Sequence, residues 1–497
     1  MTSSLIAPGF LALHSHRSEV LAETLAAWLG RQPLAPLEQE VVLVQSNGMA
    51  EWIKMALAQQ GGVCAATKVE LPSRFLWRTY RQVLGAQNVP PDSPLDKLPM
   101  TWRLMALLPT FANDPVFRPV MGFLRGNVTS AQQATGQALE PERLLQLATQ
   151  LADLFDQYQI YRPDWLEDWA PSDGSPGLNV LRTATGQTDL PEDQVWQAEL
   201  WRRVLAALSA SERQATRPAL HVRALAALQS GQASEGLVSN DWSQRVARRV
   251  SVFGMSSMPS QLLEMLAALA QHSQVLLAVP NPCQFHWGDI MDGRDALRAE
   301  RRRHAYKNKQ NLSAMPFEHM HLHAPALLTA WGRQGRDFIR QLDEFDNVQA
   351  AQERMPGQRL DLFDDAPGAD GTRLLTQLQN RIRDLQSSQD PVRAALQPKD
   401  DSVMFKVAHS AVRELEVLHD QLLQWFHDQP DLSPRDVVVM VPDIELMAPA
   451  IRAVFGQHKR SDERFIPFDI ADLGAQASSP LIQGWNGCWL CRNSAAA

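Results

Sequence analysis

The stretch from Val41 to Leu57, VVLVQSNGMAEWIKMAL, constrains the fold more than any other part of the chain. Its first four residues, 41–44, form an apolar run with the length of a buried strand. A polar turn follows at 45–48, and apolar residues then recur at the spacing of a helix with one buried face: Met49, Trp52, Ile53, Ala56 and Leu57. A strand, a tight turn and a helix near the N-terminus predict an α/β fold of the nucleotide-binding kind.

The turn itself lacks the chemistry that phosphate binding requires. A phosphate loop uses several glycines and a Lys-Ser/Thr pair for phosphate and magnesium, whereas this turn has one glycine and no lysine. It carries amide and carboxylate side chains instead, on Gln45, Asn47 and Glu51. Amide side chains suit the edges of nucleobases better than phosphates. A later predicted strand ends in Phe253-Gly254, with no acidic residue to hold magnesium.

Charge and composition exclude some classes of protein. The 497 residues allow about two to four domains with ample cores. A net charge of −8 argues against a protein that binds DNA by bulk electrostatics, although it leaves room for a local basic channel. The 14 tryptophans serve either core packing or stacking on bases.

Cysteine usage and hydropathy predict a cytoplasmic protein without membrane contact. The four cysteines, Cys64, Cys283, Cys488 and Cys491, are too few for a disulfide framework in this chain, which indicates a reducing compartment. The N-terminus has no signal-peptide pattern, and no apolar run reaches the roughly 18 residues of a membrane span. One CxxC pair without a second pair is a weak signal for zinc or redox chemistry.

Shifts in pattern divide the chain into six segments. The order is α/β, nearly all helical, α/β again, a polar linker, a second α/β unit and an aperiodic tail: 1–105, 106–245, 246–345, 346–400, 401–480 and 481–497. Strands are expected at Phe10–His14, Arg249–Met255, Val275–Val279, Val403–Ala408 and Val437–Val441. Helices are expected through Leu21, Leu25 and Leu29, and at Ser260–Ala270, Leu374–Leu385 and Glu414–Phe426.

A long helix has an apolar face that runs to Tyr161, and Arg162 is predicted to stand at its end because Pro163 stops the helix. Asp153 and Asp156 lie off its apolar stripe, three residues apart on one surface. Such a pair of carboxylates either holds magnesium or forms a solvated acidic face. A basic run, Arg298–Arg303, similarly fits either a DNA-backbone patch or a solvated helix face.

Segments spread along the chain resemble one family, RecC, the gamma subunit of exodeoxyribonuclease V (RecBCD). They keep family order: VQSNGMAEW at 44–52, LPSRFLW at 71–77, DLFDQYQIYRPDWL at 153–166, NPCQFHWGDI at 281–290, AWGRQGRDF at 330–338 and RELEVLHD at 413–420. The resemblance extends to about Pro480. Because family members are longer and the tail 481–497 is aperiodic, the sequence is expected to be a truncated or frame-shifted product.

The resemblance implies an inactivated superfamily 1 helicase whose RecA-like domains have lost the ATP site. Segments 1–105 and 246–345 would form domain 1A, 106–245 a helical insertion called 1B, and 401–480 the start of domain 2A. The implied role is a non-catalytic scaffold in recombinational double-strand break repair. Its partners would be a RecB-like helicase–nuclease, a RecD-like helicase, a duplex DNA end and single-stranded DNA scanned for a Chi-like sequence. No cofactor is expected in this chain, since ATP and magnesium act in the partner subunits.

The resemblance also implies which residues read DNA: Gln45, Asn47, Glu51, Leu71, Trp77, Asp153, Leu154, Asp156, Gln157, Arg162 and, by a looser match, Arg217. Trp77 would stack on a base. Asn47 stands where the best-known member has threonine, and Glu51 where it has glutamine. The changes in hydrogen-bonding groups and charge predict that a different sequence is read, or that Chi is read weakly.

Other interpretations remain open at this point. Trp77 and Leu71 also fit core packing, and Gln45 also fits a turn cap. The whole chain fits an interaction module without DNA-reading function. It also fits an active superfamily 1 NTPase with a degenerate loop, although the absence of both nucleotide signatures argues against that class.

Overall fold

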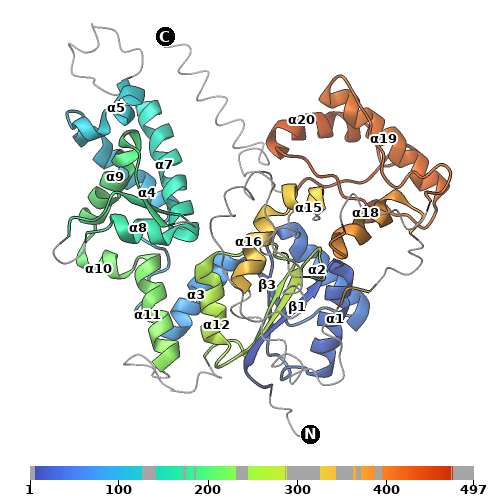
Figure 1. Cartoon of the computed structure of the whole chain (residues 1–497), viewed down its shortest axis with the longest axis horizontal. Coiled ribbons are helices and arrows are strands. Elements are labelled where there is room, and N and C mark those ends of the chain that lie inside the picture. The colour runs from blue at the N-terminus through green and yellow to red at the C-terminus, as the bar shows by residue number, and fades with distance from the viewer. Residues whose placement is uncertain are drawn as a thin grey trace. The chain divides into compact units, whose positions relative to one another are not determined.

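The computed structural model describes residues 6–125, 141–171, 175–183, 186–230, 245–285, 287, 325–342, 362–364, 371–386, 395–471 and 473 (Figure 1). Contacts divide the chain into two compact units. The first comprises Met1–Gln45, Ile53–Asp364 and Arg381–Asp390, and the second comprises Ser46–Trp52, Asp365–Asn380 and Pro391–Ala497. The basic run Arg298–Arg303, the pair Cys488 and Cys491, and the tail 481–497 lie outside the described residues.

A five-stranded parallel sheet in the order β1-β7-β6-β2-β3 forms the centre of the first unit (Figure 1). The strands are β1 (Gly9–Ser15), β2 (Glu40–Leu43), β3 (Thr67–Glu70), β6 (Arg249–Phe253) and β7 (Gln274–Pro280). Every residue of β6 is buried, as expected for the continuous apolar strands of a parallel sheet covered on both faces. The α/β prediction and the four strands predicted in this part of the chain are confirmed.

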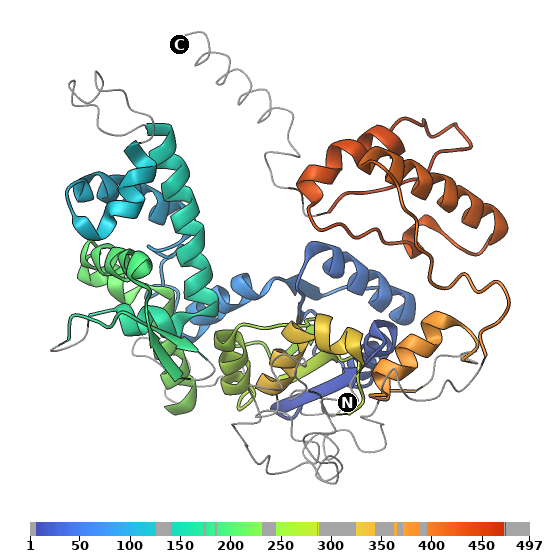
Figure 2. The same ribbon diagram turned by 45° about the horizontal axis from the view of Figure 1, so that its top comes forward.

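Helices connect and cover these strands. They are α1 (Ser18–Arg31), α2 (Asn47–Gly61), α3 (Pro72–Leu84), α11 (Arg217–Ser230), α12 (Ser260–Leu269), α15 (Ala326–Trp331) and α16 (Arg333–Leu342). Pro72 occupies the first turn of α3, where its missing N–H group leaves no hydrogen bond unmade. Helices α3, α11 and α12 lie side by side (Figures 1 and 2) and share the apolar core that covers the sheet.

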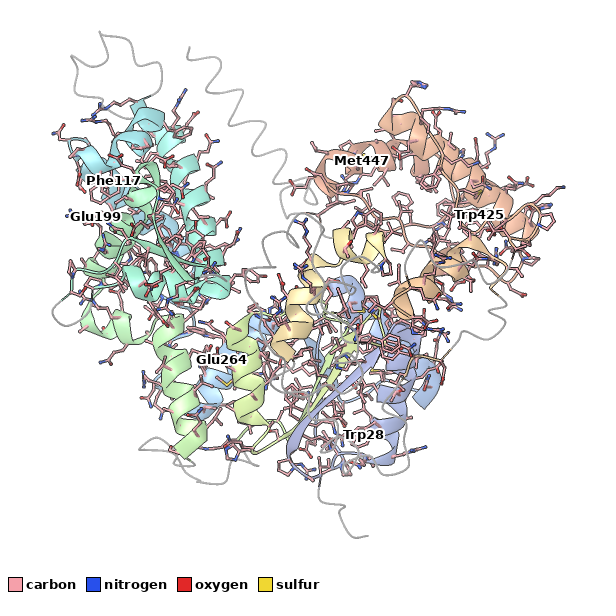
Figure 3. The ribbon with its side chains drawn as sticks, viewed as in Figure 1. Trp28, Phe117, Glu199, Glu264, Trp425 and Met447 are labelled. Atoms are coloured by element: carbon pink, nitrogen blue, oxygen red, sulfur yellow. The ribbon has the colours of Figure 1, made fainter. Side chains whose placement is uncertain are left out.

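A buried polar network lies at the amino end of β6. Arg249 is fully buried, its Nη1 lies 2.7 Å from Glu40 Oε1, and its Nε donates to Gln274 Oε1 at 2.8 Å. Its other terminal nitrogen donates to the backbone carbonyl of Gln32. Gln274 Oε1 also accepts from the indole of Trp28 at 3.0 Å (Trp28 is labelled in Figure 3). This network joins α1 to three neighbouring strands.

A helical part of the first unit contains α4 (Lys97–Leu107), α5 (Arg118–Arg125), α7 (Pro141–Tyr161), α8 (Pro163–Trp169), α9 (Val195–Ala206) and α10 (Ala210–Gln214). Short 3-10 turns lie at Leu108–Phe111, Pro115–Phe117 and Glu192–Gln194. Its core is rich in aromatic side chains: the rings of Phe155 and Trp201 stack at 5.5 Å, and Phe117 is fully buried in the same core (labelled in Figure 3). The long helix ends at Tyr161, one residue before the predicted end at Arg162, and Pro163 begins the next helix.

One part of the helical prediction is wrong. An antiparallel hairpin, β4 (Val180–Thr183) and β5 (Gly186–Asp189), lies within the segment expected to be nearly all helical. Two indoles of α8 hold the hairpin, because Trp169 Nε1 donates to the Val180 carbonyl at 2.8 Å and Trp165 Nε1 donates to that of Arg182 at 3.0 Å. The spacing of apolar residues along the chain does not predict these tertiary hydrogen bonds.

In the second unit, α19 (Ala411–Asp428) and α20 (Ile444–Phe455) pack together, and a 3-10 turn lies at Pro434–Asp436. The helix predictions at 374–385 and 414–426 are confirmed by α18 (Leu374–Arg383) and α19. The strands predicted at Val403–Ala408 and Val437–Val441 are wrong, because no ladder forms there. Their apolar side chains are exposed instead: Phe405 by 90%, Val407 by 97%, Val438 by 78% and Met440 by 86%. An apolar run forms a β-strand only where a neighbouring strand pairs with it through backbone hydrogen bonds.

Two further predictions concern cysteines and membranes. Cys64 and Cys283, the cysteines within the described residues, carry free thiols. Among the helices that the structure describes, none combines the length and apolar character needed to cross a bilayer.

Candidate nucleic-acid interface

Four of the predicted site residues meet at one cavity of about 280 Å³, here called the apolar cavity. Gln45 lies two residues after the end of β2, Leu71 precedes α3, Trp77 lies within α3, and Arg217 begins α11. The remaining wall is largely apolar and includes Pro72, Leu76, Ile160, Met255, Pro259 and Leu262. The fold therefore brings together residues from positions 45 to 217 that the sequence alone left far apart.

The apolar cavity also has polar groups that the sequence analysis missed. Gln261 on α12 lines it, and the side chain is 8% exposed. Its amide makes no hydrogen bond to any residue that the structure describes, so both its donor and its acceptor remain available to a ligand. Tyr161, at the end of α7, contributes a ring that is 63% exposed. Gln261 lies in the helical segment SQLLEML. The only sequence signal that could have identified it as a site residue is a polar side chain among the leucines of a helix expected to be buried.

A hydrogen-bonded chain, buried at Tyr80 and His221 and half-exposed at Glu264, fixes the helix that carries Trp77. The Tyr80 hydroxyl lies 3.0 Å from His221 Nδ1, and His221 Nε2 lies 3.1 Å from Glu264 on α12 (Figure 3). Burial raises the pKa of Tyr80 far above its usual range, so its phenol stays protonated. The Trp77 ring meets Tyr80 edge-on at 6.1 Å and donates its indole N–H to the Pro90 carbonyl at 3.2 Å. Trp77 is thereby held in one orientation.

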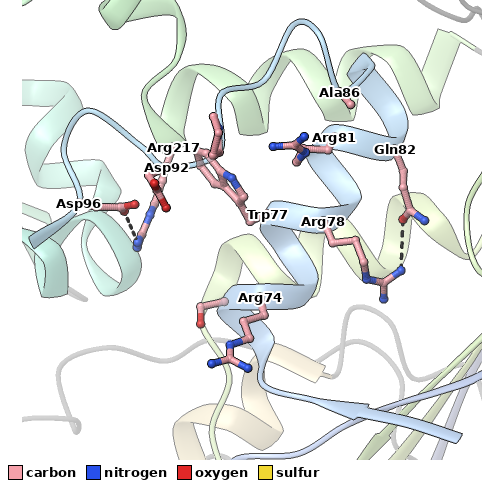
Figure 4. Close-up of a pocket in the computed structure, with 11 residues that line it drawn as sticks. Arg74, Trp77, Arg78, Arg81, Gln82, Ala86, Asp92, Asp96 and Arg217 are labelled. Carbon is pink, nitrogen blue, oxygen red and sulfur yellow. Dashed lines mark hydrogen bonds and ion pairs between the residues drawn. The ribbon is translucent and has the colours of Figure 1, made fainter. Parts of the chain in front are cut away.

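A second cavity of about 570 Å³, here called the arginine groove, shares Ser73, Trp77 and Arg217 with the apolar cavity (Figure 4). Its other lining residues are Arg74, Arg78, Arg81, Gln82, Ala86, Pro91, Asp92 and Asp96. The arginines of α3 were not predicted as site residues, although their spacing in PSRFLWRTYRQ places them on one helix face.

Arg217 connects the groove to the helical part. Its two terminal nitrogens lie 2.5 Å from Asp96 Oδ1 and 3.1 Å from Asp156 Oδ1. Burial raises the pKa of Asp156, and the positive charge of Arg217 opposes that rise. Asp153 forms its own ion pair with Lys97 at 2.5 Å. The two carboxylates considered as a magnesium pair therefore each face a separate cation.

The other predicted site residues of α7 and its end have internal contacts or face solvent. Arg162 forms two hydrogen bonds with Asp164, at 2.9 and 2.7 Å, and its guanidinium lies 3.8 Å from the centre of the Trp165 ring. Leu154 packs against the helical core, and Gln157 is exposed. None of these three side chains lines the two cavities described above.

Asn47 and Glu51 lie in the first two turns of α2, and both are exposed. Neither side chain lines the apolar cavity or the arginine groove. Asn47 and Glu51 are the positions at which this chain differs from the best-known member of the family. They therefore lie outside the apolar cavity, whereas Gln45, two residues before Asn47, lines it.

Two of the family-like segments have a packing role. A Cβ atom on Gly332 would lie 2.8 Å from the Trp287 ring and 2.4 Å from the Leu328 carbonyl oxygen. The Trp287 indole N–H donates to Asn281 Oδ1 at 2.8 Å. The segments at 281–290 and 330–338 are therefore joined by a buried tryptophan that requires a glycine opposite it.

Comparison with known proteins decides the family. The model of the RecC N-terminal domain matches residues 10–385. The chain belongs to the RecC family. The RecBCD enzyme subunit RecC of Haemophilus influenzae is 34% identical, over 96% of this chain and 42% of the relative. That of Escherichia coli is 32% identical over 95% and 40%, and that of Mycobacterium tuberculosis is 29% identical over 90% and 36%. The resemblance inferred from the sequence is confirmed, and the chain spans about two fifths of the length of these RecC proteins.

Proposed function

We propose that this chain is part of a non-catalytic, RecBCD-type subunit that binds single-stranded DNA. The observation that carries the proposal is the apolar cavity, where Trp77, Gln45 and Arg217 converge from separate elements. An indole stacks on any base, and amide side chains pair with base edges. Arg217 lines the same cavity, with its guanidinium paired to Asp96 and Asp156. These are the parts of a site for an unpaired nucleotide.

The proposed ancestry is a superfamily 1 helicase that has lost its ATP site. A parallel sheet with a turn and helix after β2 supports it, because motor domains of that kind bind nucleotide at such a turn. This turn has one glycine and no lysine. A lost motor retains a path for single-stranded DNA across its surface. The RecC relatives are named as RecBCD enzyme subunits, which supports RecB-like and RecD-like partners.

Replacement of Trp77 by alanine tests the proposal. We expect the Kd for a fluorescein-labelled single-stranded oligonucleotide to rise by about 5- to 150-fold, the equivalent of one lost base–aromatic stack of about 1–3 kcal/mol. Trp77→Phe keeps a ring and should retain most of the affinity. Fluorescence anisotropy with the purified chain measures both.

Trp102→Ala is the matched control, because Trp102 is 60% exposed on α4 and lines neither cavity. Trp77 also packs partly against the core, so the thermal unfolding of each variant is recorded alongside. A folded Trp77→Ala variant with unchanged affinity would contradict the proposal.

A second candidate function is an interaction module without DNA reading. The exposed apolar side chains of segments 403–408 and 437–441 favour it, since contiguous exposed apolar surface commonly marks protein interfaces. Purification of the tagged chain from its own cells tests it: recovery with RecB-like and RecD-like subunits supports a scaffold. Unchanged single-strand affinity in both Trp77→Ala and Arg162→Ala would favour this module over the DNA-binding function.

A further inference from the structure

We infer that the arginine groove holds the phosphate backbone of the strand whose base enters the apolar cavity, with Arg74 and Arg81 as its phosphate contacts. The inference rests on the proposed DNA binding. It adds an orientation of the bound strand, with the backbone in the arginine groove on one side of Trp77 and the base in the apolar cavity on the other. It starts from the fact that the two cavities share Ser73, Trp77 and Arg217.

The two cavities differ in the chemistry of their walls. The apolar cavity is lined mainly by aliphatic and aromatic side chains and has a volume of about 280 Å³. The arginine groove is about twice as large, at about 570 Å³, and four of its lining residues are arginines. A nucleotide has the same division, because its base is flat and largely apolar on its faces while its phosphate is anionic. Single-strand-binding proteins combine a positively charged groove along the backbone with aromatic platforms for the bases.

The charges in the groove are not equivalent. Arg78 donates two hydrogen bonds to Glu70, one of them at 3.1 Å, and Arg217 is paired with Asp96 and Asp156. These two guanidinium groups are therefore largely neutralised within the protein. Arg74 and Arg81 form no hydrogen bond or ion pair with any residue that the structure describes. They are the two cations whose charge remains available to a ligand.

Helix geometry aligns these two arginines. Arg74, Arg78 and Arg81 stand at i, i+4 and i+7 of α3, within one face of the helix, and Trp77 lies beside that stripe. Seven residues of helix span about 10 Å, so Arg74 and Arg81 reach different phosphates of one strand. Figure 4 shows the three arginines of α3, with Arg78 extending toward Gln82 and Trp77 between Arg81 and Arg217.

One acidic residue opposes phosphate binding. Asp92 lines the arginine groove, forms no ion pair with a described residue, and lies near Arg217 on the other side of Trp77 from Arg81 (Figure 4). A carboxylate here repels a phosphate. Replacement of Asp92 by a neutral residue should therefore strengthen the binding of single-stranded DNA. A merely structural role for Asp92 does not predict such a gain in affinity.

The test measures single-strand affinity against salt concentration for Arg74→Gln/Arg81→Gln. Anisotropy titrations use an oligothymidylate and a mixed-sequence oligonucleotide, at salt from about 50 to 200 mM. Each phosphate contact with single-stranded DNA contributes about −0.7 to the slope of log K against log salt, so the double variant should flatten that slope by about 1.4. Affinity should fall by more than about tenfold and equally for both oligonucleotides, because phosphate contacts carry no base information. Asp92→Asn should bind more tightly than the parent chain.

Arg118→Gln/Arg223→Gln is the matched control. It makes the same change in net charge at two exposed arginines, on α5 and α11, that line neither cavity. If both double variants flatten the slope equally, the effect is long-range electrostatics and the inference is overturned. If Trp77→Ala weakens binding while Arg74→Gln/Arg81→Gln matches the parent, the inference fails and the proposed DNA binding stands. If the parent chain binds neither oligonucleotide, both fail.

Discussion

Replacement of Arg249 by methionine should lower the free energy of unfolding of the first unit by about 3–5 kcal/mol. Methionine has a similar length and no charge, so the change leaves the carboxylate of Glu40 in a buried site without its cation. It also removes the donor to Gln274 Oε1 and the donor to the Gln32 carbonyl. Urea unfolding followed by tryptophan fluorescence measures the change, because Trp28 contacts the same Gln274 oxygen.

Arg248→Met is the control next to it in the chain. The side chains of Arg248 and Glu38 are 29% and 30% exposed, and their ion pair spans 2.6 Å. A partly exposed pair of this kind contributes about 0–1 kcal/mol. Equal losses in the two variants would show that burial of Arg249 is not what makes its network important. The double variant Arg249→Met/Glu40→Gln should recover part of the loss, since it removes the unpaired charge.

The replacement of Gly177 by alanine should destabilise the helical part of the first unit by at least about 2 kcal/mol. Gly177 has a φ of +91°, a backbone conformation that L side chains rarely adopt. Its added Cβ atom would lie 2.2 Å from the Trp169 carbonyl oxygen and 3.0 Å from Arg202 Nε. The same Trp169 holds the β4–β5 hairpin through its indole, so displacement of this residue reaches the helical core. Differential scanning calorimetry gives the shift in Tm.

Gly62→Ala separates the steric part of that effect from the backbone part. Gly62 has a similar φ of +78°, but nothing lies within 4 Å of the Cβ position. Only the backbone strain of about 1–2 kcal/mol remains there. If Gly62→Ala and Gly177→Ala lose the same stability, the contact with Trp169 plays no part in the effect.

The sequence predicted the central sheet well. The strands at Phe10–His14, 41–44 and Val275–Val279 are apolar runs bounded by polar or proline signals, and each appears in the structure within two residues at either end. The same signals failed at Val403–Ala408 and Val437–Val441. A helix satisfies its backbone hydrogen bonds within itself, so α19 and α20 form from their own pattern. A strand needs a neighbour, and its apolar run does not say whether the neighbour is present.

The candidate site was predicted only as a set of positions. Gln45, Leu71, Trp77 and Arg217 were named from family resemblance, and no local pattern indicated that they would meet. Arg162 and Leu154 were named in the same way, and the structure places them in contacts of the helical part. Side chains of the same type have different roles according to their neighbours, and those neighbours come from elements far away along the chain.

The sequence by itself determined the α/β class, the family and the lack of phosphate-loop residues in the turn after β2, because period, motif order and residue type are local properties. Tertiary structure alone decided which charges are free to bind. Arg78 and Arg217 are occupied by Glu70, Asp96 and Asp156, while Arg74 and Arg81 are not paired with any described residue. All four are arginines and look alike in sequence. Their difference arises because an ion pair forms only where the fold brings the opposite charge within a few ångströms.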